Sequence, residues 1–451
     1  MLSGAPFAVA FVAVIAVMIL AISVWRVHPF LSILGAAVIL GALCLNLDEL
    51  ADTVTGGFSA TFGSIGIIVL MGTFMGVILE RTGAALKISD AVVRALGAKR
   101  PNASLAVMGW LVSVSIFCDS GFVILNPVRK AIVKRIAASS VAATVSLSMG
   151  LFLSHCLVPP TPGPVAATGL LGIENYTVYV VAFGVLASLP ALAVACLYAR
   201  FIGKRVKDAE EAAAEKENIV TSYEELLASY GSLPNAFLSF LPIVLPLVLM
   251  SAASICTLAD FKNAAILFFG KPVVAVPAGF LASLPLLCST RRRVKLNDCV
   301  EEGIRAAGPI LFITSAGGAL GKVVGASPLI PFLTEHSEIL SSLGIFFPFL
   351  FAAILKTAQG SSTVAITTTA GVVAPMLGAL GFSSPMLQAL TVTAIGSGAL
   401  VISHVNDSYF WVVTKFGELS KTSDGYKTVA AASFLVGAAS MLTVYVISLF
   451  L

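Results

Sequence analysis

Long apolar runs recur along the whole chain and limit its possible folds more than any other feature. Each run has roughly 18 to 25 residues, enough for a helix to cross a hydrocarbon core of about 30 Å. Of the 451 residues, 58% are hydrophobic and 11% are charged. A water-soluble domain of this size could not cover so much apolar surface. The runs therefore predict an all-α, polytopic membrane protein.

The predicted spans form two groups separated by one polar stretch. Spans are expected at 5–24, 29–45, 58–79, 141–157 and 177–202, and again at 237–254, 273–288, 306–321, 385–402 and 428–451. An acidic loop is expected at 48–52. The polar stretch 203–235 carries charges of both signs and is expected to be a cytoplasmic linker with a helix at 208–217. The chain thus divides into a first half, 1–202, and a second half, 236–451.

An apolar segment of the first half, about 103–128, is interrupted by polar residues around Asp119. Basic clusters at 99–100 and 129–130 flank the segment, and basic flanks favour the cytoplasm. A re-entrant hairpin that turns at 119–121 satisfies both flanks, and irregular backbone at membrane depth is tolerated only where it lines a cavity. One straight span is the alternative.

A second interruption lies in the segment at about 343–377, which is too long for one span. Its polar part runs from Lys356 to Thr363, and no cytoplasmic basic cluster flanks it. The preceding span, 306–321, would deliver Lys322 to the outside. We therefore expect a second re-entrant hairpin that enters from the outer face.

Each hairpin is followed by another helix break that carries a histidine. His155 precedes four prolines within 159–164, which cannot continue a helix. In the second half, His404 precedes Asn406 and Asp407.

The two halves repeat each other at an offset of 242 residues, which joins Gly76 to Gly318 and Asp119 to Ser361. By the charge pattern, the first glycine-rich span runs inward and its counterpart outward, so the repeat is inverted. Secondary transporters with inverted repeats bind substrate near the midplane, between discontinuous helices. Chance alignment of glycines in glycine-rich helices is the alternative.

The breaks supply the candidate site residues, because hydroxyl groups, amides and backbone N–H groups at helix starts can bind a carboxylate. Candidate substrate ligands are Ser120, Gly121, Asn126, Thr161, Gly360, Ser361, Ser362, Thr363 and Asn406. Such hydroxyls also commonly bond to their own backbone. No arginine lies in either predicted hairpin, which favours a monocarboxylate over a di- or tricarboxylate.

Candidate carriers of a coupling proton are the titratable groups at the breaks, Asp119, His155, His404 and Asp407. Burial raises the pKa of a carboxylic acid, and histidine titrates near 6.5. Asp407 could instead be a solvated helix cap. Lys356 could bind the anion, neutralise an acid or extend toward the membrane surface.

Other classes of protein find little support in the sequence. The seven cysteines form no Cys-x-x-Cys pair, and no phosphate-binding glycine loop or metal-ligand spacing occurs. We expect no cofactor, metal or nucleic-acid partner. A channel would have a repeated filter, and an intramembrane enzyme would have a catalytic motif that the chain lacks.

Four motifs resemble the gluconate permease family of proton symporters. They are Asp-Ser-Gly-Phe-Val-Ile-Leu-Asn-Pro at 119–127, His-x-x-x-Pro-Pro-x-Pro-Gly-Pro at 155–164, Ala-Gln-Gly-Ser-Ser-Thr-Val-Ala at 358–365 and Ser-His-Val-Asn-Asp at 403–407. The resemblance implies a scaffold domain, a transport domain with two opposed hairpins and elevator-type movement. It also implies a substrate such as gluconate, a related sugar acid or, in some members, D-serine.

The chain departs from the family pattern at three positions. It has Asp119 where the family usually has Glu, Thr161 where a second His is usual, and Lys356 where Arg is usual. The first change shortens an acidic side chain and the second removes a titratable group. We therefore expect related site chemistry with a smaller or different substrate, and the proton carrier stays open.

These features predict an inner-membrane importer, not an enzyme, that couples a small hydroxylated monocarboxylate to protons and forms a homodimer. The alternative is a sodium-coupled carboxylate symporter or a D-serine-type amino acid symporter of the same fold, since hydroxyls and hairpin carbonyls also ligate Na⁺.

Overall fold

The computed structural model describes residues 4–96, 101–136, 139–206, 233–259, 261, 263–289, 294–335, 343–419 and 421–451. Within these residues every regular element is a helix, and eight helical segments are long and apolar enough to cross a membrane. The predicted all-α class is therefore confirmed. The helix expected at 208–217 lies outside the described residues.

The helices of the two halves are bounded as follows. The first half has α1 (Gly4–Ser23), α2 (Pro29–Cys44), α3 (Leu47–Arg81), α4 (Ala84–Leu96), α5 (Pro101–Val112), α6 (Cys118–Ile136), α7 (Ser140–Leu157), α8 (Pro162–Leu170), a 3₁₀ turn (Glu174–Tyr176) and α9 (Thr177–Ile202). The second half has α12 (Ala236–Leu258), α13 (Ala264–Phe269), α14 (Pro272–Ser283), α15 (Pro285–Ser289), α16 (Leu296–Ala326), α17 (Leu329–Glu335), α19 (Phe346–Gln359), α20 (Ser362–Val373), α21 (Pro385–Leu400), α22 (Ser408–Phe416), α23 (Thr422–Gly425), a π-helical turn (Tyr426–Ala430) and α24 (Ala431–Ser448).

Several predicted spans match their helices within two residues, among them α1, α2, α7, α9 and α21. The acidic loop expected at 48–52 is wrong, because α3 begins at Leu47 and includes it. Asp48 and Glu49 lie in the first turn of α3, where negative side chains complement the helix dipole. The Asn46 backbone N–H also donates to Glu49 Oε2 at 3.4 Å, which favours a helix start here.

The order of helices in the first half recurs in the second. Helices α5, α6, α7 and α9 begin at 101, 118, 140 and 177, and α19, α20, α21 and α23 begin 244 or 245 residues later, at 346, 362, 385 and 422. These offsets exceed the predicted 242 residues by two or three, so they do not join Asp119 to Ser361, and the inverted repeat stays a prediction.

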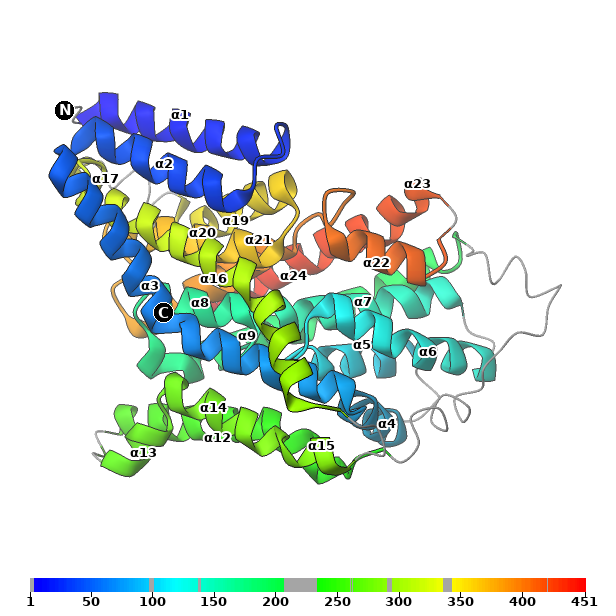
Figure 1. Ribbon diagram of the computed structural model, residues 1–451. Helices are drawn as coiled ribbons and strands as arrows, with labels where there is room; N and C mark the ends of the chain where they lie inside the picture. The colour runs from blue at the N-terminus through cyan, green and yellow to red at the C-terminus, as the bar shows by residue number, and fades with distance from the viewer. Residues whose placement is uncertain are drawn as a thin grey trace.

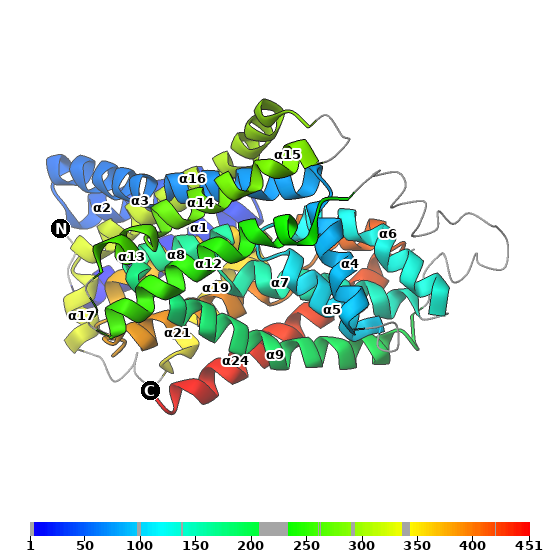
Figure 2. The ribbon, with the colours of Figure 1, turned by 90° about the horizontal axis from the view of Figure 1, so that it is seen from below.

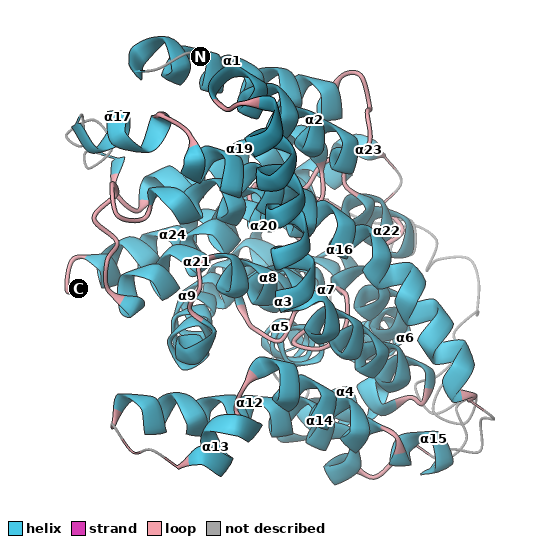
Figure 3. Cartoon of the chain, turned by 60° about the vertical axis from the view of Figure 1, so that its left-hand side comes forward, coloured by secondary structure: helices cyan, strands magenta, loops and turns pink. Residues whose placement is uncertain are grey.

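The helices are arranged in three groups. Figures 1 and 3 show α1 and α2 along one edge of the molecule and α12 to α15 along the opposite edge. Helices α7, α9, α21 and α24 pack together between them, and α3 and α16 pack against each other. Seen from below in Figure 2, α12 and α14 lie side by side in front of α7.

Glycines let α3 and α16 approach closely. A Cβ at Gly57 would lie 2.7 Å from the backbone oxygen of Gly318, and a Cβ at Gly318 would lie 1.9 Å from the hydroxyl of Thr61. Small residues at helix contacts are expected where two helices pack inside a membrane protein.

Each half contains two consecutive helices separated by a non-helical break, α5 and α6 in the first half and α19 and α20 in the second. Helix α5 is about 18 Å long and α19 about 21 Å, less than the roughly 30 Å of a hydrocarbon core. The second break, Gly360–Ser361, lies within the predicted 356–363. The first break lies at 113–117, so the turn expected at 119–121 is wrong, and Asp119 lies in the first turn of α6.

Candidate functional site at four helix breaks

Four helices begin at breaks in the middle of the chain's two halves, namely α6, α8, α20 and α22. The break between α7 and α8 falls at 158–161, as the prolines predicted. Helix α6 packs against α22, and α8 packs against α20, so each break contacts a helix of the other half. The first N–H groups of a helix lack partners within it and carry partial positive charge, which suits an anion.

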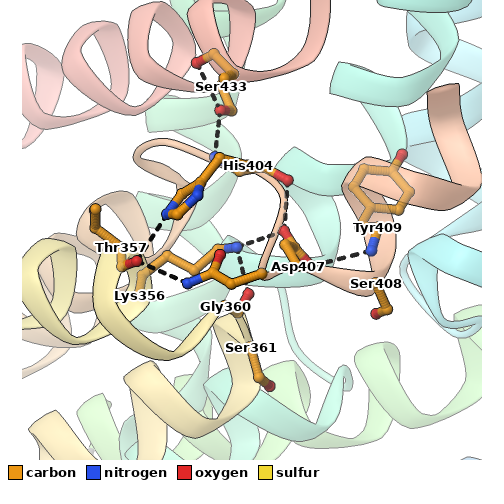
Figure 4. Close-up of polar contacts among 12 residues, drawn as sticks. Lys356, Thr357, Gly360, Ser361, His404, Asp407, Ser408, Tyr409 and Ser433 are labelled. Atoms are coloured by element: carbon orange, nitrogen blue, oxygen red, sulfur yellow. Dashed lines mark hydrogen bonds and ion pairs between the residues drawn. The ribbon is translucent and has the colours of Figure 1, made fainter. Parts of the chain in front are cut away.

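A buried ion pair lies beside the second break. Lys356 Nζ is 2.5 Å from Asp407 Oδ2 and donates to the Gly360 backbone oxygen, also at 2.5 Å (Figure 4). The lysine is 0% exposed and the aspartate 5%. Of the roles considered for Lys356, the contact with an acid is the one the structure shows.

Asp407 has two further hydrogen-bond partners. The Ser403 hydroxyl donates to Oδ2 at 2.5 Å, and the Tyr409 backbone N–H donates to Oδ1 at 3.0 Å. Asp407 therefore caps the start of α22, but it is buried and paired with a cation, so the solvated cap considered from the sequence is wrong.

His404 and Asn406 bind the end of α19. The His404 ring donates from Nε2 to the Thr357 backbone oxygen at 2.8 Å, and the Asn406 amide donates to the same oxygen at 2.8 Å. Carbonyls in the last turn of a helix lack intrahelical partners, so these contacts satisfy one of them. Both side chains thus fix the 401–407 loop against α19.

Gly360 makes this contact possible. Its φ is +92°, a conformation that L side chains rarely adopt. A Cβ there would lie 2.2 Å from the Asn406 backbone oxygen. The turn between α19 and α20 therefore requires glycine.

His155 joins the two halves at the start of α20. Its Nε2 lies 3.4 Å from the Thr363 hydroxyl, and its ring centroid is 6.1 Å from that of Phe117. The side chain is 4% exposed, and Nδ1 has no hydrogen-bond partner among the described residues. A buried ring nitrogen without a partner is available to a ligand or a proton.

Asp119 lies opposite the start of α22. The Ser408 hydroxyl donates to its Oδ1 at 3.2 Å, and the Cys118 thiol lies 3.8 Å from Oδ2. No basic side chain lies within 4 Å of it among the described residues. Figure 4 shows the side chains of Ser361 and Ser408 both pointing away from the Lys356–Asp407 pair.

A cavity of about 70 Å³ lies where the first break meets α3, α8 and α16, and Ser120 and Thr161 line it with the carboxylates of Glu80 and Glu302. The Thr161 hydroxyl also donates to the Val158 backbone oxygen at 2.6 Å.

The structure does not bring every predicted ligand into this group. Gly121 faces α7, since a Cβ there would lie 2.7 Å from a methyl of Leu151. Asn126 accepts a 2.7 Å hydrogen bond from Arg129, whose guanidinium also donates to the Ser140 hydroxyl at 2.6 Å. Helix α6 continues to Ile136, past the predicted end at 128, and Arg129 is 0% exposed within it. Arg129, expected only as a basic flank of the predicted hairpin, is therefore a buried residue of α6 with polar partners inside the protein.

The hydroxyls at the start of α20 differ in their roles. Ser361 Oγ accepts from the Val364 backbone N–H at 3.3 Å and so caps the helix, while Ser362 and Thr363 lie buried in its first turn. Sequence reasoning missed Ser403, Ser408 and Thr357. Ser403 is four residues before Asp407 in the same motif, a spacing that could have indicated it, whereas nothing local marks Thr357, which acts through its carbonyl.

Comparisons with known proteins agree over the full length. Residues 6–450 match the GntP family of permeases. A protein named an uncharacterized permease from Haemophilus influenzae is 35% identical over 86% of this chain and 81% of its own. The gluconate permease of Pseudomonas aeruginosa is 27% identical over 96% of both chains. The inner membrane permease YgbN of Escherichia coli is 28% identical over 91% of this chain and 92% of its own.

The fold resembles a solved structure, that of the YdaH transporter from Alcanivorax borkumensis. The TM-score is 0.62 with 16% sequence identity, and the match covers 94% of this chain and 99% of that one. At this identity the likeness concerns the fold alone. With eight candidate spans and these relatives, the chain is a multi-pass protein of the inner membrane.

Proposed function

Because the chain belongs to the GntP family of permeases, we propose that it imports gluconate or a related hydroxylated monocarboxylate by symport with protons. It is a secondary active transporter and not an enzyme. The substrate lies between the starts of α6, α8, α20 and α22, within reach of Ser120, Thr161 and the hydroxyls at 361–363.

The observation that carries this proposal is the position of Lys356. Its ammonium contacts Asp407 and the Gly360 carbonyl, so the substrate carboxylate is left with neutral donors: hydroxyls and helix N-termini. Such donors suit one carboxylate with several hydroxyl groups. A tricarboxylate would need further cationic partners.

In this proposal Asp119 carries the coupling proton. It lies at a helix start beside a hydroxyl from the other half, and no basic side chain lies within 4 Å of it among the described residues. Asp407, in contrast, is held by Lys356 and caps α22. His155, with its free Nδ1, is the second group that can bind substrate or a proton.

The two units α5–α6 and α19–α20 are re-entrant hairpins in this proposal. It is supported by the arms α5, α19 and α20, which at 12, 14 and 12 residues are too short to cross a bilayer. Helices α5–α9 and α19–α24 form the transport domain and move as an elevator against a scaffold of α1–α3 and α12–α16. The halves 1–202 and 236–451 are inverted repeats. The homodimer stays a prediction.

The test is uptake of labelled gluconate into membrane vesicles that contain the purified protein. We expect accumulation when the only imposed gradient is an inwardly directed proton gradient, and exchange of labelled for unlabelled substrate without any gradient. Accumulation driven by sodium alone would contradict proton coupling. Neither accumulation nor exchange with any hydroxylated monocarboxylate would contradict the substrate class.

A further inference from the structure

A second cavity, apart from the breaks, lies between α3 and α16 and the far ends of α8 and α20. Its volume is about 380 Å³, and glycines from four helices line it, among them Gly57, Gly169, Gly318 and Gly371. Lys322 of α16 is the only charged residue that lines it within the described part of the chain. An opening of this size holds a small organic acid together with water.

Lys322 has no counter-ion in the described structure, where no carboxylate lies within 4 Å of its ammonium. The side chain folds over the backbone of α3, with Nζ 2.4 Å from where a Cβ of Gly56 would lie. A side chain at residue 56 would therefore displace the ammonium. The two glycines at 56–57 thus give the lysine room against the cavity.

This cavity and the one at the first break lie at opposite ends of α8. Thr161 and Pro162, at the start of α8, line the first cavity, and Gly169 and Leu170, at its end, line the second. The nine residues of α8 separate them by about 13 Å.

The cavities at the two ends of α8 are lined by charges of opposite sign. Lys322 gives the large cavity an unpaired positive charge, whereas Glu80 and Glu302 line the cavity at the break. The charge pattern of the chain places Lys322 on the outer face, from which an imported anion arrives. A cation at the mouth of a narrow opening raises the local concentration of anions.

We propose that the cavity under Lys322 is an outer waiting site for the substrate, and that the Lys322 ammonium binds its carboxylate before transfer to the helix breaks. This inference rests on the proposed import of a monocarboxylate and adds a second binding position to it. Lys322 is a substrate-binding residue at entry and does not take part in proton coupling.

Initial rates of gluconate uptake at increasing concentration test the proposal. Because an exposed charge pair contributes up to about 1 kcal/mol, Lys322→Gln should raise KM roughly three- to fivefold at low salt and leave the maximal rate near that of the wild type. Lys322→Arg should retain the wild-type KM. The matched control Lys421→Gln, which removes an exposed lysine at the start of α23, should change neither value.

Salt and chemical modification separate a charge effect from a structural one. The wild-type KM should rise with ionic strength, and that of Lys322→Gln should not. In Lys322→Cys, a reagent that adds an aminoethyl group should restore a low KM, and one that adds a sulfonatoethyl group should raise it further. Gly56→Ala, which displaces the ammonium, should raise KM in the same way as Lys322→Gln.

An unchanged KM in Lys322→Gln would overturn the waiting site. So would a raised KM that neither arginine nor the aminoethyl group restores, because the lysine would then act through packing. If the wild-type protein itself transports no hydroxylated monocarboxylate, the proposed function fails. That outcome is distinct from a wild-type protein that transports gluconate while Lys322→Gln leaves KM unchanged.

Discussion

Removal of one partner from the buried Lys356–Asp407 pair should destabilise the protein strongly. In Lys356→Met, Asp407 keeps the Ser403 hydroxyl at 2.5 Å and the Tyr409 N–H at 3.0 Å but loses its cation. In Asp407→Asn, the ammonium keeps the Gly360 carbonyl and its position 5.6 Å from the centroid of the Phe152 ring, but it loses its anion. Both variants leave a buried charge without its counter-ion.

The structure sets the size of the effect. Removal of one partner from a buried ion pair typically lowers the free energy of unfolding by about 3–5 kcal/mol. Because Asp407 keeps two hydrogen bonds in Lys356→Met, we expect the loss in that variant to lie near the lower value. The double variant Lys356→Met/Asp407→Asn buries no charge at this point. It should lose less than the sum of the single variants, with a coupling free energy of about 2–3 kcal/mol.

Reversible unfolding of the purified protein in mixed micelles, as SDS is added, measures these free energies. The ion pair between Arg81 and Glu302 is the matched control, because it has a similar N–O distance, 2.6 Å, but side chains that are 57% and 38% exposed. Glu302→Gln should lower the free energy of unfolding by less than about 1 kcal/mol. Additive effects of Lys356→Met and Asp407→Asn, or losses no larger than the control, would refute the argument.

Three further predictions follow from the site. Asp119→Asn should insert and exchange substrate but not accumulate it under a proton gradient, and accumulation at the wild-type rate would exclude Asp119 as the coupling group. Gly360→Ala should abolish uptake and destabilise the protein by at least about 1–3 kcal/mol, because φ is +92° and the Asn406 carbonyl blocks a Cβ; Gly378→Ala, with open space around it, is the neutral control. An analogue of gluconate that lacks one hydroxyl group should compete with labelled gluconate roughly ten- to a hundredfold more weakly, because a buried donor or acceptor of the protein then has no partner. Citrate should compete least.

Hydrophobic run length predicted much of the fold, because the interval between polar boundaries fixes where a membrane helix begins and ends. Run length predicted the wrong helix ends where a helix continues through polar residues. Helix α3 begins in an acidic stretch, since Asp48 and Glu49 favour a helix start, and α6 continues past Arg129 because Asn126 and Ser140 bind the guanidinium.

The site was predicted as a set of residues but not as a set of contacts. The sequence indicated Lys356, His404, Asn406 and Asp407 as functional groups, yet it could not show that the lysine contacts the aspartate 51 residues later. Nor could it show that His404 and Asn406 bind a backbone oxygen. Such contacts depend on how the 401–407 loop packs on the end of α19, which no local pattern specifies.

The proposed function requires that one substrate molecule binds between the break at 113–117 and the break at Gly360–Ser361. Ser120→Cys lines the cavity at the first break, and Ser361→Cys lies at the second, where Ser361 is exposed. Each would be introduced singly into a transport-competent variant without the seven native cysteines and labelled with a membrane-impermeant thiol reagent in opened vesicles. Gluconate should slow labelling at both positions over the same concentration range. Protection at only one position, in a protein that still transports gluconate, would contradict a site shared by the two breaks.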